Sequence, residues 1–301
     1  MNYYNEIKNK LVDNEIYKRV KDYSKNKNEL MTYYEVGKLL IEAQGGEERA
    51  KYGDGLIKEY SKRLTLELGK QYTYTTLSRM RQFYLIYEII APLAQHLTWS
   101  HIQELLPIKD NRKMLYYALQ IKKYNLSKYK IREKIKSNEY ERLDDNAKNN
   151  LLLNNNSNIE DNLKHPIIIK NRYNNEDISE KVLKKLILEN IGGFMTELGE
   201  GFSFINSEYK IKLGDRYNYI DLLLFNYIYN CFVVVELKVT ELKAEHIGQI
   251  KKYINYIDKD IKDITHNKTI GIIIVRKDNK FVMEYCSDPR IFRTTYMLVG
   301  N

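Results

Sequence analysis

Three charged side chains interrupt two strand-like runs that are otherwise strongly apolar. Asp221 lies in the middle of Tyr-Ile-Asp-Leu-Leu-Leu-Phe, and the run Phe-Val-Val-Val-Glu-Leu-Lys ends in Glu236 and Lys238. Runs as apolar as these are typical of strands that are buried on both faces. A buried carboxylate without a partner costs several kcal/mol, so its presence indicates a neighbouring positive group or a cation.

The spacing of the two runs predicts that the two carboxylates meet. Side chains alternate across a strand, so Glu236 and Lys238 project from the same face, about 6 to 7 Å apart. A hairpin connection over residues 226–230, centred near Ile228, places Asp221 opposite residue 235 or 236. Directly opposed side chains have Cβ atoms roughly 4.5 to 5.5 Å apart.

Two carboxylates at such a distance repel each other unless positive charge lies between them. Lys238 supplies one positive charge, and a hard divalent cation bound by oxygen atoms supplies the rest. We expect Asp221 and Glu236 to hold Mg²⁺ or Mn²⁺, with the carbonyl oxygen of Leu237 as a further metal ligand. The alternative is a structural ion pair buried in an α/β domain.

The elements around these residues predict two domains. In the second half, a helical run at 178–198 precedes strand-like runs at 201–213, 217–225 and 231–239, a helix from 242 to about 261 and a strand at 269–276. This alternation predicts an α/β layer arrangement. The first half has helical spacing, and residues 144–164 are rich in Asn without periodicity. We therefore expect a helical domain at 1–145, a linker at 146–165 and an α/β domain at 166–301.

A candidate DNA-reading element lies in the first half. Thr73 begins a helix in which Leu77, Met80, Tyr84 and Tyr87 form an apolar stripe, while Arg79 and Arg81 point elsewhere. A helix, a tight turn and a second helix with arginines on its free face is the pattern of a helix-turn-helix domain. An ordinary amphipathic helix with two exposed arginines is the alternative.

The net charge of +9 is almost entirely in this half. Residues 1–150 carry 28 Lys+Arg against 20 Asp+Glu, and residues 151–301 carry 21 against 20. Ten basic and three acidic residues lie between Arg112 and Arg142, interleaved with tyrosines, which favours phosphates and stacked bases as partners. A solvated helix face explains the same composition.

Composition also limits the location of the protein. The two cysteines, Cys231 and Cys286, are too few for a disulfide framework, and no run of 18 uninterrupted apolar residues occurs. Residues 1–10 are polar and lack the apolar segment of a secretion signal. We expect a cytoplasmic protein without a membrane partner.

The order of motifs resembles the PD-(D/E)XK nuclease signature, here as Asp221, Glu236, Leu237 and Lys238 ahead of a helix. In that helix, Gln249 and Tyr253 stand at i and i+4 and are similar to the Q-x-x-x-Y motif of some of these nucleases. The resemblance implies that Gln249 positions Lys238 or the attacking water and that Tyr253 contacts the DNA backbone.

Many of these enzymes add an acid from the first core helix. Glu189 and Glu197 both remain candidates for this acid, because both lie in line with Gly193 at multiples of four residues.

The resemblance extends to most of the chain. Residues 194–202, 219–224 and 231–238 resemble the nuclease domain of bacterial YhcG-like proteins, and residues 34–42, 49–53, 80–84, 97–101 and 140–143 are similar to that family's N-terminal domain. The family implies a two-domain α+β protein. Its N-terminal domain is all-α, and its C-terminal domain is a restriction-endonuclease-like α/β domain with a mixed central sheet and an αβββαβ core.

These observations predict a Mg²⁺-dependent deoxyribonuclease whose basic N-terminal domain holds double-stranded DNA. One alternative is an inactive DNA-binding or assembly protein that keeps the nuclease fold, although the chain retains both carboxylates and the lysine. Another is an RNA-processing nuclease, because a basic stretch rich in Tyr is able to stack unpaired bases. The sequence leaves a homodimer open.

Overall fold

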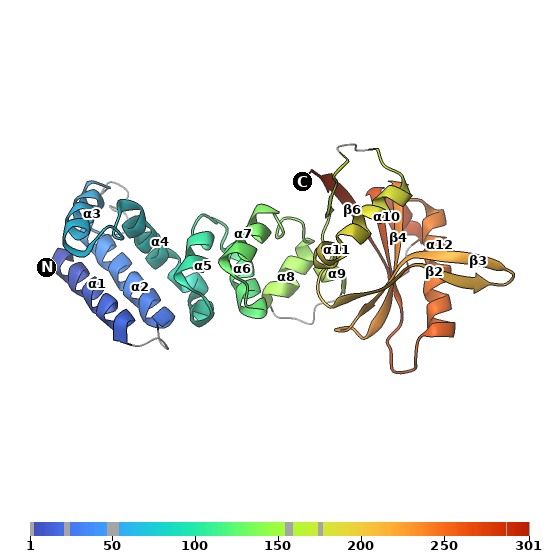
Figure 1. The fold of residues 1–301 in the computed structure, drawn as a ribbon, viewed down its shortest axis with the longest axis horizontal. Coiled ribbons are helices and arrows are strands. Elements are labelled where there is room, and N and C mark those ends of the chain that lie inside the picture. Colours follow the sequence, from blue (N-terminus) through green and yellow to red (C-terminus); the bar gives the residue numbers. More distant parts are fainter. Residues whose placement is uncertain are drawn as a thin grey trace. The chain divides into compact units, whose positions relative to one another are not determined.

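The computed structural model describes residues 3–20, 25–46, 54–153, 159–173, 177–286 and 288–300. The chain divides into two compact units, Met1–Tyr140 and Glu141–Asn301 (Figure 1). No helix among the described residues is both long enough and apolar enough to cross a membrane. The family-like segment at residues 49–53 lies outside the described part of the chain.

The described part of the first unit is entirely helical, as the sequence predicted. Its helices are α1 (Tyr3–Val20), α2 (Lys25–Ala43), α3 (Asp54–Leu68), α4 (Tyr74–Ile90), η2 (Ala91–His96), α5 (Trp99–Leu105), α6 (Asn111–Tyr124) and α7 (Lys128–Lys136). Helix α4 begins where expected, because the side chain of Thr73 accepts a hydrogen bond of 3.3 Å from the backbone N–H of Thr76. This bond satisfies one of the free donors at the helix start.

Helices α2 and α4 pack closely at a glycine. A Cβ atom on Gly37 of α2 would lie 2.1 Å from the carbonyl oxygen of Met80 in α4. No side chain fits between the two backbones at this point. Gly37 therefore sets the distance at which the buried face of α4, which includes Leu77 and Phe83, meets its neighbour.

The expected linker at 146–165 is wrong for the residues that the structure describes. Helices α8 (Asp145–Leu153) and α9 (Ile159–Asn162) lie there. The carboxylate of Asp144 accepts a hydrogen bond of 2.9 Å from Asn146 N–H and starts α8, while Ile159 and Leu163 are buried in the core of the second unit. The Asn-rich composition concealed these few apolar positions.

The second unit is built on one mixed sheet of six strands, ordered β1-β6-β5-β4-β3-β2. The strands are β1 (Ile167–Lys170), β2 (Phe202–Leu213), β3 (Arg216–Asn226), β4 (Cys231–Glu241), β5 (Ile270–Lys277) and β6 (Ile291–Val299). Strands β4, β5, β6 and β1 run parallel to one another, and β3 is antiparallel to both β4 and β2. The mixed sheet is confirmed, but β1 and β6 were not predicted.

Helices cover both faces of this sheet. Helices α10 (Glu180–Glu189) and α11 (Ile191–Leu198) pack on one apolar face, and α12 (Ala244–Tyr256) packs on the other. The helix expected at 178–198 is divided at Asn190, and the one expected to end near 261 closes with a π-helical turn, η3 (Ile257–Ile261). The remaining helix is α13 (Lys280–Cys286).

Strands β3 and β4 separate part-way along their length. Their pairing runs from Asn226 opposite Cys231 to Leu222 opposite Val235, whereas β3 stays paired with β2 as far as Arg216. Residues 208–220 therefore continue as a two-stranded ribbon, which we call the β2–β3 arm. It extends beyond the other strands of the sheet (Figure 1).

Candidate active site

The two expected carboxylates meet where β3 and β4 separate. Leu222 pairs with Val235, so Asp221, the next residue toward the arm, lies at the level of Glu236. This register confirms the hairpin geometry predicted from the turn. The Oδ2 atom of Asp221 accepts a hydrogen bond of 3.0 Å from the backbone N–H of Leu237, which continues the contact between the strands past the end of their ladder.

Glu236 is the most buried member of the site, with 2% of its surface exposed. Its Oε1 atom accepts hydrogen bonds from Lys238 Nζ and Gln249 Nε2, both at 2.8 Å. Its Oε2 atom is buried and has no hydrogen-bond partner among the described residues. Burial, with a smaller effect of the nearby Asp221 charge, raises the pKa of Glu236 to about 7 against the opposing effect of Lys238.

Lys238 is held by carboxylates on two elements. Its Nζ atom lies 2.8 Å from Glu236 Oε1 and 3.7 Å from Glu180 Oε2, which belongs to the first turn of α10. Burial works to lower the pKa of Lys238, but the contact with Glu236 and the charge of Glu180 outweigh it, so the pKa is raised. The ammonium group therefore stays charged beside the buried carboxylate.

A second lysine, which the sequence analysis missed, holds Asp221. Lys184 of α10 places its Nζ atom 2.7 Å from Asp221 Oδ1 and 3.2 Å from Glu208 Oε1. Burial works to lower the pKa of Lys184, and the bonds to Asp221 and Glu208 raise it above its ordinary value. Glu180 and Lys184 stand four residues apart, so one face of α10 supplies both.

Gln249 and Tyr253 form a pair that faces the sheet. Besides its bond to Glu236, Gln249 Nε2 donates to the hydroxyl oxygen of Tyr253 at 3.1 Å. Gln249 therefore contacts the carboxylate and not Lys238. Tyr253 is only 4% exposed, but it also lines the cleft next to the site, so its contact with the DNA backbone stays a prediction.

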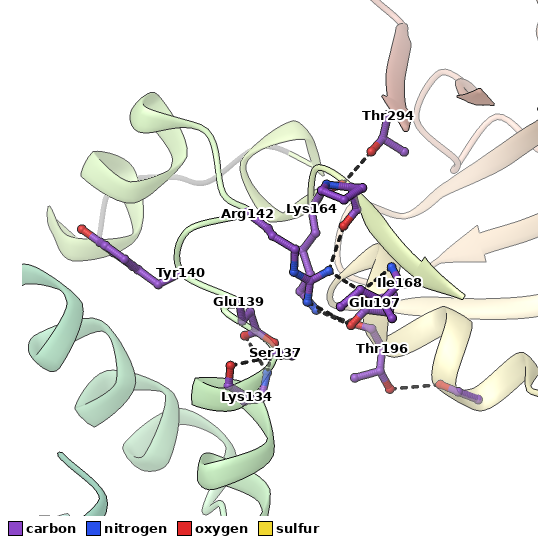
Figure 2. A network of polar contacts seen from close by, with 12 residues as sticks. Lys134, Ser137, Glu139, Tyr140, Arg142, Lys164, Ile168, Thr196, Glu197 and Thr294 are labelled. Atoms are coloured by element: carbon purple, nitrogen blue, oxygen red, sulfur yellow. Dashed lines mark hydrogen bonds and ion pairs between the residues drawn. The ribbon is translucent and has the colours of Figure 1, made fainter. Parts of the chain in front are cut away.

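The structure does not bring either expected first-helix acid to this place. Glu189 pairs with Arg172 at 2.5 Å. Figure 2 shows Glu197 against Arg142, with the backbone N–H of Ile168 donating to it at 2.9 Å. Glu180 lies at the site instead. Glu180 directly follows Ser179, which caps the start of α10, and this could have been recognised in the sequence. Because one continuous helix was expected over 178–198, the acid was sought near its C-terminal end instead.

A cleft of about 550 Å³ adjoins the site. Lys238, Gln249 and Glu180 line it together with Asn218 of the arm and two lysines, Lys243 and Lys252. The charged end of Lys238 therefore faces a space that a phosphate group is able to enter.

The donor set at the site fits a hard divalent cation. No three His, Cys, Asp or Glu side chains gather into a metal-binding cluster anywhere in the described parts of the chain. Mg²⁺, however, is usually held by one or two carboxylates and keeps several waters. The unpartnered Oε2 atom of Glu236 beside Asp221 supplies that arrangement.

The candidate DNA-reading residues of the first unit differ from each other. Arg79 is exposed on α4, whereas Arg81 is half-buried and donates to Gln44 Oε1 at 3.3 Å. In the basic stretch that follows, Tyr116 and Tyr117 are buried, while Tyr129 is exposed. Most of those aromatic rings therefore pack in the core, and Arg79 is the stronger candidate for a phosphate contact.

Two protein families match different parts of the chain. Residues 160–299 match the family described as the YhcG PDDEXK nuclease domain, and residues 10–142 match the DUF1016 N-terminal domain. Residues 160–299 therefore form a YhcG PDDEXK nuclease domain. A curated relative named "Putative nuclease YhcG", from Escherichia coli (strain K12), is 25% identical over 288 residues, which are 82% of this chain and 77% of that protein.

Solved structures resemble this chain over less of its length. A repair endonuclease from Pyrococcus abyssi is 20% identical with a TM-score of 0.29, over 42% of this chain and 49% of that one. The EndoMS–dsDNA complex is 19% identical with a TM-score of 0.29, over 43% and 48%. The match thus spans about half of each solved chain.

Proposed function

We propose that this nuclease is a Mg²⁺-dependent deoxyribonuclease that hydrolyses phosphodiester bonds in double-stranded DNA. The observation that carries this proposal is the unpartnered, buried Oε2 atom of Glu236, level with Asp221 and beside Lys238. A site that kept the fold without the chemistry would have no need to retain a buried carboxylate in this state.

Three residues would bind the cation. Asp221 and Glu236 would hold the cation, with the carbonyl oxygen of Leu237 as a third ligand. Bound there, a divalent cation supplies positive charge beside the phosphate and lowers the pKa of a neighbouring water. Lys184, whose Nζ atom lies 2.7 Å from Asp221 Oδ1, holds this carboxylate in place.

The remaining groups orient the water and the other side chains of the site, and they balance charge. Lys238 orients the attacking water and offsets the negative charge that grows on the phosphate during attack. Gln249 fixes the orientation of Glu236 through Oε1, and Tyr253 in turn holds Gln249. Glu180, 3.7 Å from Lys238, keeps the ammonium group directed into the cleft.

The N-terminal unit would hold the duplex. The excess of basic over acidic residues in positions 1–150, together with the exposed Arg79 on α4, supports contacts to phosphates. Such contacts are independent of DNA sequence, so binding weakens as the salt concentration rises.

Incubation of the full chain with supercoiled plasmid and Mg²⁺ tests this proposal. We expect cleavage that EDTA abolishes and that Glu236→Gln and Lys238→Ala each reduce by at least about 100-fold, the scale of a lost catalytic group. Glu241→Gln, an exposed acid on the same strand, is the matched control and keeps activity. Full cleavage by Glu236→Gln would remove the metal site from the mechanism.

The substrate class is tested in parallel. Duplex DNA, single-stranded DNA and RNA of the same sequence are compared at one protein concentration. Preference for the duplex supports the proposal, whereas cleavage of RNA alone would replace it with an RNA-processing nuclease.

A further inference from the structure

The β2–β3 arm has one exposed face that begins at Asp221, on the side of the arm opposite to Asn218, which lines the cleft. Side chains alternate along a strand, so Tyr217, Tyr219 and Asp221 project from the same side of β3. The register places Lys212 opposite Tyr217 and Lys210 opposite Tyr219, and opposed residues share a face. We call Lys210, Lys212, Tyr217 and Tyr219 the lysine–tyrosine face.

This face takes no part in the core. Tyr217 is 57% exposed and Tyr219 is 54% exposed, whereas Ile211 and Ile220 on the other side of the arm are buried against the α12 side of the sheet. Lys210 Nζ lies 3.8 Å from the centroid of the Tyr217 ring, which holds the ammonium group on the surface of the arm. Two neighbouring exposed rings with cations beside them are typical of a binding surface.

The charge of the face is not cancelled by its surroundings. Glu208, the nearest acid along β2, is bonded to Lys184 at 3.2 Å. In the part of the chain that the structure describes, Lys210 and Lys212 form no ion pair with a carboxylate. Residues 151–301 are almost balanced in net charge, so the positive potential next to Asp221 comes from these two lysines themselves.

The spacing of the face suits a nucleic-acid strand. Each step of two residues along a strand covers about 6 to 7 Å, so the two lysines lie at roughly 7 and 13 Å from the level of Asp221. Each DNA strand carries one phosphate for about every 3.4 Å of helix axis. The two lysines therefore reach different phosphates of one strand that leaves the active site along the arm.

We propose that the lysine–tyrosine face binds the DNA backbone next to the bond that is cleaved. Lys210 and Lys212 contact two different phosphates of one strand, and Tyr217 and Tyr219 pack against the sugars between them. The arm thereby holds the substrate strand where it approaches Asp221. This inference rests on the proposed function, because it assumes that the strand held by the arm is the strand cleaved at this site.

The test measures binding separately from cleavage. Full-length Glu236→Gln protein, with and without Lys210→Ala plus Lys212→Ala, is titrated into a labelled DNA duplex, and fluorescence anisotropy is recorded at several salt concentrations. We expect affinity to fall by about 10-fold or more and the slope of log K against log salt to shrink by about 2, one for each lysine. In the cleaving protein the double variant raises KM and leaves kcat nearly unchanged.

Lys259→Ala plus Lys268→Ala is the matched control, since it removes the same charge from two exposed lysines elsewhere in the unit. Binding and salt slope equal to those of the control would overturn the inference. If the wild type cleaves DNA and the arm variant binds DNA as the control does, only the role of the arm is disproved. Absence of cleavage by the wild type, with the expected loss of binding, disproves only the proposed nuclease chemistry.

Discussion

The four oxygens of Asp221 and Glu236 have different surroundings. Both oxygens of Asp221 and one of Glu236 accept hydrogen bonds, from Lys184, Leu237, Lys238 and Gln249. The fourth, Oε2 of Glu236, has no such partner in the described chain. A cation therefore binds most favourably at Glu236 Oε2, where it displaces no hydrogen bond. Single substitutions should change activity by different amounts, depending on which oxygen loses its partner.

Replacement of Glu236 tests the cost of this buried charge. Burial raises the pKa of Glu236 to about 7 from its ordinary 4.5. A carboxyl whose pKa is higher in the folded state contributes stability at low pH that is lost as the pH rises through about 7. Glu236→Gln should therefore stabilise the metal-free protein at pH 8 by roughly 1 to 3 kcal/mol and much less at pH 5.5.

Thermal unfolding at the two pH values measures this difference. Mg²⁺ at pH 8 should raise the melting temperature of the wild type and not of the variant, because ligand binding stabilises only the form that binds it. An equal effect of the substitution at both pH values would contradict a raised pKa at Glu236.

Gln249 and Tyr253 should contribute unequally to catalysis. Gln249→Leu removes a donor to Glu236 Oε1 and should lower kcat/KM by roughly 10- to 100-fold, the scale of losses when a group that orients a metal ligand is removed. Tyr253→Phe removes only the acceptor behind Gln249 and keeps the buried ring, so its loss should be smaller. A larger loss for Tyr253→Phe than for Gln249→Leu would show a direct role for the hydroxyl group.

The sequence was sufficient to predict the central residues but not their supports. Asp221, Glu236 and Lys238 belong to one hairpin, so alternation and the turn near Ile228 determine how they meet. Lys184 reaches Asp221 from a helix that precedes the hairpin, and this contact depends on how the helix packs on the sheet. Local patterns carry no information on such packing.

At the scale of elements, two positions matter for how the helices pack. One is a glycine that has no side chain, and the other is a break between two helices. Gly37 allows α2 to approach the backbone of α4. At Asn190 the chain leaves α10 and begins α11, and Gly193 then packs on the Asn190 side chain, where a Cβ would lie 2.5 Å from its nitrogen. Neither break nor close approach was predicted from periodicity, because both residues lie within continuous helical patterns.

Gly37→Ala should destabilise the N-terminal unit. The added methyl group would overlap the carbonyl oxygen of Met80, a backbone atom that moves only with α4 itself. Overpacking of this kind costs about 1 to 3 kcal/mol. Chemical denaturation of the full chain measures the loss, and Gly55→Ala, where a Cβ would meet nothing within 4 Å, is the control. Equal stability of the two variants would contradict the close packing.

At the scale of the molecule, the two units differ in charge. The excess of basic residues lies in positions 1–150, while the nuclease half is almost balanced. The sequence predicted this division and the all-α first half, but placed the boundary at a linker that is largely helical. The error arose because Ile159 and Leu163 are single apolar residues among asparagines, too sparse to predict a buried face.

Removal of residues 1–140 should separate binding from chemistry. The remaining unit, 141–301, contains every residue of the candidate site and should still cleave plasmid with Mg²⁺ at high protein concentration. Its affinity for a DNA duplex should fall by about 10-fold or more and depend less on salt, because phosphate contacts are lost. Gel-shift titrations at two salt concentrations measure both effects, and unchanged affinity would assign DNA binding to the nuclease unit alone.

Strand β1 pairs with β6, so the earliest and the latest strands of the nuclease unit lie side by side. Residues as far apart as Lys164 and Thr294 are joined by a hydrogen bond of 2.7 Å. During synthesis, Asp221 and Glu236 leave the ribosome before β5 and β6 exist to complete the sheet behind them. A copy that ends before β5 therefore leaves the second edge of β4 unpaired and the candidate site without the complete sheet behind it.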